Sequence, residues 1–477
     1  MSSNGNSLIG AYLDRIRNFY DSAPTESSLF GRHYRALLGH YYRFLIPPNA
    51  SILEIGCGSG ELLEQLPNRD VTGVDLSSTQ IERARKRIPH GTFHVGAAEF
   101  LERTAGINRT FDYIILSDTV NYAADVQMIL EKLKAFAHER SRLILNFYNT
   151  VWYPIMKIGT ALGIKAREPV SNWFSTSDVQ NLLALSSWEA IHHEHRVLLP
   201  APILGLEKLV NRFIAPFLPF FCLTIFQTAR VCMDSRLPPQ KVSVVVPARN
   251  EAGNIEAVVE RVPDIGAGTE IVFVEGHSKD DTYERIQRVA ADHPERSIKI
   301  LRQSGKGKGN AVREAFEVAT GDILMILDAD LTMPPEELGK FYEALVSRRT
   351  EAVNGVRLVY PMEAKAMRFL NMCANKFFSI AFSWIIGQSI KDTLCGTKVL
   401  FRRDYQSIAA NRSFFGDFDP FGDFDLLFGA AKLNLKIIDI PVRYQERTYG
   451  ETNIRRWTHG WLLLKMLVFA LFKIKFV

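Results

Sequence analysis

Residues 321–335 read Gly-Asp-Ile-Leu-Met-Ile-Leu-Asp-Ala-Asp-Leu-Thr-Met-Pro-Pro, an apolar run that ends in Asp328 and Asp330. A short apolar run bounded by Gly and Pro predicts a buried strand. Two carboxylates at the exit of such a strand point into the crevice where α/β proteins bind their ligands. The stretch therefore predicts an α/β fold and a place to hold a divalent metal ion, Mg²⁺ or Mn²⁺, against a diphosphate.

Helix capping is an alternative role for the same two carboxylates. The residues that follow, 334–337, read Pro-Pro-Glu-Glu, which suits the first turn of a helix. Because Asp is a common cap, Asp328 and Asp330 by themselves leave both interpretations open. The sequence upstream favours the ligand site.

Two further strand exits precede the acidic pair. The β-branched run 241–247 leads into Ala-Arg-Asn-Glu, and the run 270–274 leads into Glu-Gly-His-Ser-Lys-Asp-Asp-Thr. Exits rich in acids and amides can bind a ribose and a base, as a nucleotide-binding βαβ unit requires. A third segment, 305–311, reads Gly-Lys-Gly-Lys-Gly-Asn-Ala and leads straight into the helix before the acidic strand.

Residues 241–457 resemble a family 2 glycosyltransferase with the GT-A fold, and most of all the dolichyl-phosphate and polyprenyl-phosphate sugar synthases. The motifs that carry the resemblance stand in family order: Pro-Ala-Arg-Asn-Glu-Ala-Gly-Asn-Ile, Lys-Gly-Asn-Ala-Val-Arg-Glu-Ala-Phe, Ala-Thr-Gly-Asp, Asp-Ala-Asp-Leu-x-x-Pro-Pro-Glu, Leu-Cys-Gly-Thr-Lys and Arg-x-Tyr-Gly-Glu-Thr. The resemblance implies an inverting enzyme that moves a sugar from a nucleotide donor to a polyprenyl phosphate.

The same resemblance implies roles for individual residues. Donor binding falls to Pro247, Asn250, Glu251, Glu275, Asp280 and Asp328, metal binding to Asp328 and Asp330, and catalysis to Asp330 together with the phosphate-binding Arg357 and Arg447. Two positions depart from the family pattern. The usual Asp-Asp-Gly-Ser at the second strand exit is Glu-Gly-His-Ser here, and Thr332 stands where many relatives have Gln.

The identity of the acceptor turns on whether the attacking oxygen needs a base. A lipid phosphate is already anionic at neutral pH, whereas a sugar hydroxyl must lose a proton to a nearby carboxylate. Asp423 and Asp425, in a repeated Gly-Asp-Phe-Asp, lie where family 2 enzymes that act on hydroxyls keep their base. Capping of the following helix is their alternative role. We favour a polyprenyl phosphate acceptor, with the sugar hydroxyl of a cell-surface or lipid-linked glycan as the alternative.

A glycine-rich turn opens the amino-terminal half of the chain. Residues 51–60 read Ser-Ile-Leu-Glu-Ile-Gly-Cys-Gly-Ser-Gly, a strand that runs into Gly56, Gly58 and Gly60. Glycine lets a ligand approach the backbone closely. The next strand ends in Asp75, which is placed to accept hydrogen bonds from ribose hydroxyls. A dinucleotide fingerprint is the competing interpretation, but its spacing is Gly-x-Gly-x-x-Gly rather than Gly-x-Gly-x-Gly.

Residues 35–150 resemble a class I S-adenosylmethionine-dependent methyltransferase. The resemblance rests on the glycine turn with Glu54 before it, on Asp75, and on stretches at 93–99, 111–118 and 142–147 that look like the third, fourth and fifth strands. It implies S-adenosylmethionine as cofactor, bound by Glu54, Gly56, Gly58, Gly60 and Asp75, with Glu99 near the adenine. No Asn-Pro-Pro-Tyr motif follows residues 111–118, so methylation of a nucleic-acid amine is not supported.

Length and composition agree with two catalytic units. A chain of 477 residues is longer than a single hydrophobic core usually supports, so two domains are expected. The expected division is a helical extension at 1–34, a methyltransferase domain at 35–200, an apolar segment with linker at 201–240, a GT-A domain at 241–457 and an apolar tail at 458–477. The net charge of +5 does not demand a nucleic-acid partner and suits an anionic lipid surface.

Membrane association is expected from apolar segments that are short for a span. Residues 213–226 are interrupted by two prolines and read either as an interfacial hairpin or as a cap on the methyltransferase pocket. Residues 461–477 carry three lysines and suit a helix lying in the interface, with a packing helix as the alternative. Residues 377–386 look like the acceptor-lipid helix of the polyprenyl-phosphate enzymes.

The five cysteines include no Cys-x-x-Cys pair, which fits a reducing compartment. The first residues show no signal pattern. We therefore expect a peripheral or monotopic protein on the cytoplasmic face. The predicted protein is a bifunctional transferase. In the alternative function, the amino-terminal half modifies the glycosyltransferase product or serves only as a binding module.

Overall fold

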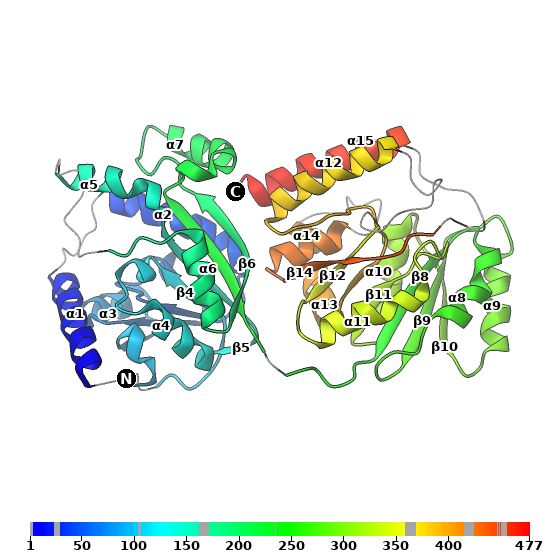
Figure 1. Ribbon diagram of the computed structural model, residues 1–477, viewed down its shortest axis with the longest axis horizontal. Helices are drawn as coiled ribbons and strands as arrows, with labels where there is room; N and C mark the ends of the chain where they lie inside the picture. The colour runs from blue at the N-terminus through cyan, green and yellow to red at the C-terminus, as the bar shows by residue number, and fades with distance from the viewer. Residues whose placement is uncertain are drawn as a thin grey trace. The chain divides into compact units, whose positions relative to one another are not determined.

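The computed structural model describes residues 3–22, 29–103, 106–161, 171–233, 235–357, 369–414, 424–445, 447, 449 and 456–477. The chain forms two compact units, Met1–Cys232 with Phe476–Val477 and Met233–Lys475. Each unit is a seven-stranded sheet flanked by helices (Figure 1). The predicted fold class, α/β with two Rossmann-like units, is confirmed.

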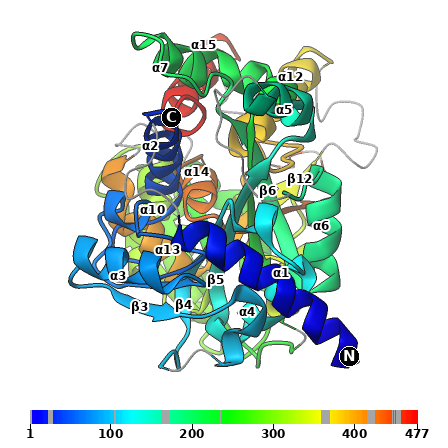
Figure 2. The ribbon, with the colours of Figure 1, turned by 90° about the vertical axis from the view of Figure 1, so that its left-hand side faces the viewer.

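The strands of the first unit are β1 (Ile52–Ile55), β2 (Val71–Asp75), β3 (Thr92–Val95), β4 (Phe111–Ser117), β5 (Ala137–Tyr148), β6 (Trp188–Arg196) and β7 (Thr224–Val231). Its helices are α1 (Ser3–Asp21), α2 (Leu29–Leu45), α3 (Ser78–Arg87), α4 (Val126–Leu133), α5 (Tyr153–Ala161), α6 (Thr176–Leu185) and α7 (Leu206–Leu209). Helix α1 packs beside α3 (Figure 2).

The strand order of the first sheet is β3-β2-β1-β4-β5-β7-β6. Strands β1 to β5 are parallel, and β7 runs antiparallel to both of its neighbours. From β1 the chain builds outward on one side through β2 and β3, and then returns to build the other side from β4. The carboxyl ends of β1 and β4 therefore border the switch point, where ligands of open α/β sheets bind.

The hydrophobic core of the first unit includes side chains of the central strands of its sheet. All four residues of β1 are buried, as a parallel strand covered on both faces requires. Tyr42 and Leu38 of α2 pack against Ile52, Ile115 and Ile144 of the sheet.

The strands of the second unit are β8 (Val242–Ala248), β9 (Thr269–Glu275), β10 (Ser297–Arg302), β11 (Ile323–Ile326), β12 (Ala352–Val356), β13 (Lys398–Phe401) and β14 (Ile437–Pro441). Its helices are α8 (Ile255–Arg261), α9 (Thr282–Asp292), α10 (Lys308–Val318), α11 (Leu338–Val346), α12 (Phe369–Ile386), α13 (Arg402–Ala410), α14 (Phe424–Lys432) and α15 (Arg456–Ala470).

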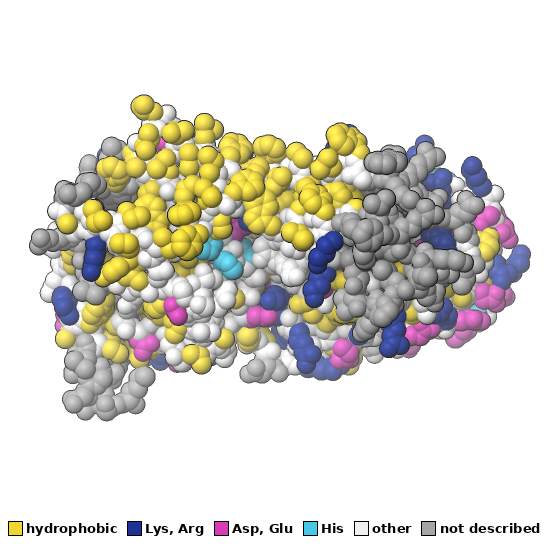
Figure 3. All heavy atoms as spheres, turned by 45° about the horizontal axis from the view of Figure 1, so that its top comes forward, with side chains coloured by type: hydrophobic (Ala, Val, Ile, Leu, Met, Phe, Trp, Pro, Cys, Tyr) yellow, Lys and Arg dark blue, Asp and Glu magenta, His cyan; other side chains and the backbone are white. Residues whose placement is uncertain are grey.

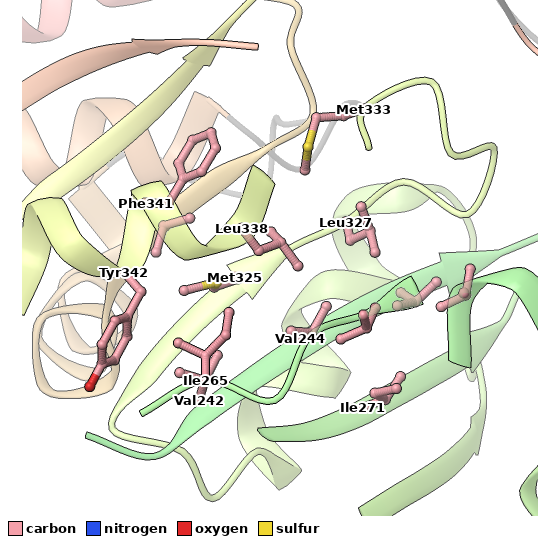
Figure 4. Packing of buried hydrophobic residues seen from close by; sticks show 14 of the residues in the cluster. Val242, Val244, Ile265, Ile271, Met325, Leu327, Met333, Leu338, Phe341 and Tyr342 are labelled. Carbon is pink, nitrogen blue, oxygen red and sulfur yellow. The ribbon is translucent and has the colours of Figure 1, made fainter. Parts of the chain in front are cut away.

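The second sheet has the order β10-β9-β8-β11-β13-β12-β14. Strands β8 to β11 are parallel, and β13 is antiparallel to β11 and β12. Side chains of β8 and β11, such as Val244 and Met325, pack with Leu338 and Phe341 of α11 in the core (Figure 4). The switch point between β8 and β11 lies next to the acidic pair, as the sequence predicts.

Two segments differ from the expected domain outline. The range 201–240, assigned to an apolar segment and linker, contains β7, an internal strand whose eight residues are all buried. The first sheet therefore extends past residue 200. In the tail, α15 packs against α12, and Leu463, Met466 and Ala470 are buried.

Candidate active sites

The glycine turn of the first unit follows β1, and its glycines have positive φ angles. Gly56, Gly58 and Gly60 have φ angles of +73°, +51° and +76°. A Cβ on Gly56 would lie 2.5 Å from the hydroxyl of Thr119, so this glycine is required by contact as well as by conformation. A Cβ on Gly58 would meet nothing within 4 Å, which leaves that side of the turn open to a ligand.

Asp75 braces this turn. Its Oδ2 accepts a hydrogen bond from the backbone N–H of Gly58 at 2.7 Å, and its Oδ1 accepts one from Ser77 at 2.8 Å. Burial raises the pKa of Asp75, while these backbone donors act in the opposite direction. The carboxylate thus links the exits of β1 and β2 at the predicted cofactor site.

Glu54 has the environment expected of a cofactor ligand. It is buried in β1, and its Oε2 atom has no hydrogen-bond partner among the described residues. Burial, and then the charge of Asp75, raise the pKa of Glu54 well above its usual value. A buried acceptor without a partner is costly, so this site fits a cofactor that donates a hydrogen bond or carries a positive charge. S-adenosylmethionine has both properties.

Glu99 is placed differently from the other predicted ligands. It is buried in a short helical turn, and its Oε1 accepts a hydrogen bond from the backbone of Ala124 at 2.8 Å. Burial raises its pKa. This carboxyl therefore holds the loop before α4, and a contact with adenine stays a prediction.

A partly buried polar cluster at the ends of β4 and β5 was not identified from the sequence. Asn146 donates to Asp118 at 2.6 Å and accepts from the hydroxyl of Tyr42 at 2.7 Å. The hydroxyl of Tyr34 donates to Asp118 at 3.3 Å. The only signal in the sequence is an Asp directly after an apolar strand.

The acidic pair of the second unit lies at the exit of β11, and each carboxylate faces a cation. Lys308 Nζ lies 2.6 Å from Oδ1 of Asp328, and Arg447 Nη2 lies 2.5 Å from Oδ2 of Asp330. Burial acts to raise the pKa of Asp328, but Lys308 more than offsets it and holds that pKa below its usual value. The lysine comes from the glycine-rich segment 305–311, so this segment lies next to the exit of the acidic strand.

Glu251 connects the β8 exit to the same cluster. Its Oε1 accepts a hydrogen bond from Nη1 of Arg447 at 3.2 Å, and its Oε2 accepts one from Asn254 at 2.8 Å. Burial raises the pKa of Glu251 to about 7, despite the opposing charge of Arg447. Arg447 therefore bridges two predicted donor and metal ligands, Glu251 and Asp330.

The remaining predicted donor residues join the exits of β8 and β9. Asn250 adopts a left-handed conformation with φ of 57°, and its Oδ1 accepts from the N–H of Lys279 at 2.7 Å. Glu275 accepts from the N–H of Ser278 at 2.5 Å, and Asp280 accepts from Ala252 at 3.4 Å. Pro247 lies within β8 itself.

Arg357 is held in a buried ion pair. Its Nε and Nη2 donate to the two oxygens of Asp392 at 2.7 and 2.9 Å. Burial acts to lower the pKa of Arg357, but the Asp392 charge raises it above its usual value. Asp392 also accepts from Asn375 at 2.8 Å. To contact a phosphate, as the sequence predicts, Arg357 would either keep its two hydrogen bonds to Asp392 or exchange them for bonds to the phosphate.

Of the two candidate bases, Asp423 lies outside the described residues. Asp425 is buried in the first turn of α14, where its Oδ2 lies 3.3 Å from Nε of Arg313 and 3.9 Å from Nε of Arg412. This carboxylate is therefore an ion-pair partner of two arginines.

The predicted metal ligands are the two carboxylates of the acidic pair. Among the described residues, no group of three or more His, Cys, Asp or Glu side chains is arranged to hold a metal ion. Thr332 donates its hydroxyl to Asp330 at 2.8 Å. Two carboxylates fit a cation such as Mg²⁺ that completes its shell with phosphate oxygens and water.

Sequence comparison identifies both units. The family model described as "Glycosyl transferase family 2" matches residues 243–408, and the one described as "Methyltransferase domain" matches residues 53–143. The resemblance found in the sequence is thus confirmed in both halves.

Curated relatives resemble the second unit. A dolichol-phosphate mannosyltransferase of Pyrococcus furiosus is 29% identical over 223 residues, which cover 45% of this chain and 59% of the relative. An undecaprenyl-phosphate 4-deoxy-4-formamido-L-arabinose transferase of Pectobacterium carotovorum is 28% identical over 216 residues, 44% of this chain and 62% of the relative. The chain thus spans about three fifths of the length of these relatives.

Solved structures resemble each unit at low identity. Glucosyl-3-phosphoglycerate synthase of Mycobacterium tuberculosis is 19% identical and has a TM-score of 0.37, covering 49% of this chain and 81% of that chain. A methyltransferase of Thermotoga maritima, described as S-adenosylmethionine-dependent, is 18% identical with a TM-score of 0.33, covering 46% of this chain and 98% of that chain.

Proposed function

We propose, from the premise that this chain joins a methyltransferase domain to a family 2 glycosyltransferase domain, that it carries two active transferase sites. The second domain moves a sugar from a nucleotide donor to a polyprenyl phosphate, and the first transfers a methyl group from S-adenosylmethionine. The observation that carries the sugar-transfer proposal is the cluster of Asp328, Asp330 and Glu251 with Lys308 and Arg447 at the switch point.

This cluster suits the departure of a nucleoside diphosphate. The bond between the anomeric carbon and the diphosphate oxygen breaks while a phosphate oxygen of the acceptor bonds to that carbon. Lys308 and Arg447 stabilise the diphosphate as negative charge accumulates on it. A divalent cation, when held by Asp328 and Asp330, supplies further neutralisation of the leaving group. Asn250, Glu275 and Asp280 join the exits of β8 and β9, where they orient the nucleoside.

The contacts of Asp425 favour a phosphate acceptor. Its carboxylate is engaged by Arg313 and Arg412, and a general base must be within reach of the proton it takes. A phosphate oxygen attacks without such a base. Sugar transfer to a hydroxyl of a glycan remains the second candidate function, since the other candidate base, Asp423, lies outside the described residues.

Association with a membrane surface is supported by one face of α12 and α15. Exposed apolar side chains on these helices, and on the helical turn Leu471–Lys475 that follows α15, are Phe377, Ile380, Trp461, Leu464, Val468 and Phe472, which we term the apolar face. Hydrophobic side chains gather on the surface of this unit in Figure 3. No helix in the described ranges is long and apolar enough to cross a bilayer. A helix buried on one side and apolar on the other can lie in the plane of the lipid interface, which we place at the cytoplasmic side.

Sugar transfer is tested directly with a polyprenyl phosphate and a panel of nucleotide sugars. Formation of a polyprenyl-phosphate sugar by the full chain, lost in Lys308→Ala and retained in Lys306→Ala, is the expected result. Lys306 provides the control because it is a neighbouring cation of the same segment. Transfer to glycan hydroxyls alone would support the second candidate function instead.

Cofactor binding is tested by calorimetry with S-adenosylmethionine. Asp75→Ala should weaken binding by about 1.5 to 3 kcal/mol, because a charged acceptor is lost and the Gly58 turn is no longer braced. Asp70→Ala is the matched control, since Asp70 forms an exposed pair with Arg109 just upstream of β2. Equal affinities for the two variants would contradict the assignment of Asp75.

A further inference from the structure

The polar cluster of Asp118 and Asn146 has no role in cofactor binding as described above. Asn146 is fully buried, and its side-chain amide aligns the carboxylate of Asp118 by donating to Oδ1 at 2.6 Å. Tyr34 donates to the same oxygen and shares a second hydrogen bond, of 3.1 Å, with the hydroxyl of Thr224. A carboxylate with several fixed donors is held in one orientation.

Helix capping does not account for Asp118. It stands immediately before the helical turn Thr119–Tyr122, but its side chain makes no capping hydrogen bond there. Its backbone is left-handed, with φ of 55° and ψ of −1°. This conformation costs energy for a residue with a Cβ, and such residues are frequent at functional sites.

Asp118 lies beside the predicted cofactor turn. The next residue, Thr119, donates its hydroxyl to the carbonyl of Ile55 at 2.7 Å, and it is this hydroxyl that a Cβ on Gly56 would strike. Asp118 therefore borders the switch point from the β4 side, while the glycines border it from the β1 side. A group placed there can reach whatever approaches the methyl donor.

An aromatic run leads from this carboxylate toward the surface. The ring centroids of Tyr34 and Tyr148 are 6.3 Å apart, those of Tyr148 and Trp173 are 5.8 Å apart, and those of Trp173 and Tyr153 are 5.2 Å apart. Tyr148 is buried, Trp173 is half-buried and Tyr153 is exposed. Such rings present flat apolar surfaces next to a polar group, which suits the C–H face of a sugar ring whose hydroxyls point toward the carboxylate.

We propose that Asp118 is the proton acceptor of methyl transfer to a sugar hydroxyl, with the sugar ring lying on Trp173. The proposal rests on the methyltransferase function proposed above and names its substrate class. Asn146 and Tyr34 act as positioning residues. Burial, and then the charge of Asp118, raise the pKa of Tyr34 well above its usual value, so this phenol stays protonated and donates at neutral pH.

The step balances without a further reagent. The acceptor O–H bond breaks and its proton passes to the carboxylate of Asp118. An electron pair of the oxygen forms the new O–CH₃ bond, while the pair of the broken S–CH₃ bond stays on sulfur, which leaves as a neutral thioether. No oxidation or reduction occurs.

Asp118→Asn tests the proton acceptor in the full chain. Transfer of labelled methyl groups to methyl glycosides of glucose, galactose and mannose should fall about 10²-fold to 10⁴-fold. Affinity for S-adenosylmethionine, measured by calorimetry, should stay unchanged. Asp14→Asn removes the same charge from an exposed site on α1 and serves as the control. An unchanged rate in Asp118→Asn, or loss of cofactor affinity in that variant, would overturn the assignment.

Tyr34→Phe separates a positioning role from a structural one. Removal of a donor to the Asp118 carboxylate should move the acidic limb of the pH–rate profile upward, by about one pH unit. A loss of rate by the same factor at every pH, with the acidic limb at its wild-type position, would contradict the positioning role of Tyr34.

The sugar platform is tested by saturation-transfer NMR, which does not depend on turnover. Ring C–H protons of the methyl glycosides should receive saturation from the wild-type protein and from Trp173→Phe, and lose it in Trp173→Ala. Equal transfer in all three proteins would overturn the platform. If the wild type binds S-adenosylmethionine but neither binds nor methylates any glycoside, the sugar inference fails alone. If the wild type does not bind the cofactor, both this inference and the proposed methyltransferase activity fail.

Discussion

Lys308 Nζ lies 2.6 Å from Oδ1 of Asp328, at the place where the sequence predicts a metal ion. Arg447 likewise forms an ion pair with Asp330, with Nη2 2.5 Å from Oδ2. Each carboxylate thus has a cationic partner before any divalent ion binds. Lys308 comes from the glycine-rich segment 305–311, and Arg447 is a residue that the family resemblance assigns to phosphate binding. Asp328 and Asp330 would have to release these ion pairs to hold a divalent ion, which would supply charge neutralisation for the donor diphosphate, and Lys308 and Arg447 would then be available to contact its phosphates.

The first prediction concerns metal dependence. Asp330→Asn keeps the side-chain shape but removes one of the two charges that would hold the metal, so sugar transfer should fall by at least about 10²-fold while the fold is retained. Radiometric assays with Mg²⁺ or Mn²⁺ and circular dichroism measure the two effects. Asp322→Asn is the control, because Asp322 precedes the other end of the same strand and is exposed. Full activity in EDTA would contradict the metal role.

The second prediction is a pH dependence that belongs to Glu251. Its folded pKa of about 7 lies above the usual 4.5, so the folded state binds an extra proton between these values. That contribution to stability is complete below about pH 4.5 and is lost as the pH rises through 7. Between pH 5 and 8 the wild type should lose on the order of 1 kcal/mol more stability than Glu251→Gln, a figure reduced for solvent screening.

Scanning calorimetry of the full chain at the two pH values measures this difference. Glu256→Gln is the control, since Glu256 is an exposed acid on α8. A pH dependence in Glu251→Gln equal to that of the wild type would show that another group is responsible.

How much of this site can be predicted from the sequence depends on how far apart its residues lie along the chain. Asp328 and Asp330 are placed by their own strand, and an apolar run with a following Asp-x-Asp is visible in one short window. The contact of Arg447 with Asp330 joins residues 117 positions apart, so only the family resemblance brought them to one site. The ion pair of Arg357 with Asp392 had no local pattern at all.

The first unit illustrates the same limit. Its glycine turn and Asp75 are local signals, and all three glycines have positive φ angles in the structure. Strand β7 was missed because residues 213–226 were treated as one apolar segment broken by prolines. The β-branched and aromatic residues of 224–231 were the available signal for a strand. Asn146 was missed because a single Asn in a buried strand identifies no partner.

The third prediction concerns the buried pair of Arg357 and Asp392. Asp392→Ala leaves a guanidinium buried without its partner, so the free energy of unfolding should fall by about 3 to 5 kcal/mol. Glu336→Ala, which breaks the exposed pair with Arg261, should cost less than about 1 kcal/mol. Thermal and urea unfolding compare the two variants. Equal stability of both would mean that the Arg357 guanidinium is stabilised by other groups.

The fourth prediction concerns the apolar face of α12 and α15. Deletion of the tail is a poor test, because Leu463, Met466 and Ala470 of α15 are buried and their removal would expose the core. Replacing the exposed Trp461, Leu464, Val468 and Phe472 with Ser should instead abolish most sedimentation with liposomes while leaving the thermal midpoint nearly unchanged.

High salt should release little wild-type protein from the liposomes, because burial of apolar area dominates over charge. Leu185→Ser, at an exposed apolar position on α6, provides the control. Undiminished sedimentation of the four-residue variant would place the membrane contact elsewhere, with residues 213–226 the next segment to test.

The fifth prediction distinguishes the two acceptors through Asp425. Because its Oδ2 lies 3.3 Å from Arg313 and 3.9 Å from Arg412, we expect it to stabilise α14 rather than to take a proton. Asp425→Asn should therefore lower transfer to polyprenyl phosphate by less than about tenfold, below the 10²-fold or more typical of a lost base. It should also lower the thermal midpoint.

Arg313→Gln provides the matched variant, since it breaks the same ion pair from the other side. The stability losses of Asp425→Asn and Arg313→Gln should be less than additive in the double variant, as expected of residues in contact. A thousandfold loss of transfer in Asp425→Asn, with circular dichroism unchanged and Arg313→Gln still active, would instead identify Asp425 as a base. The acceptor would then be a sugar hydroxyl.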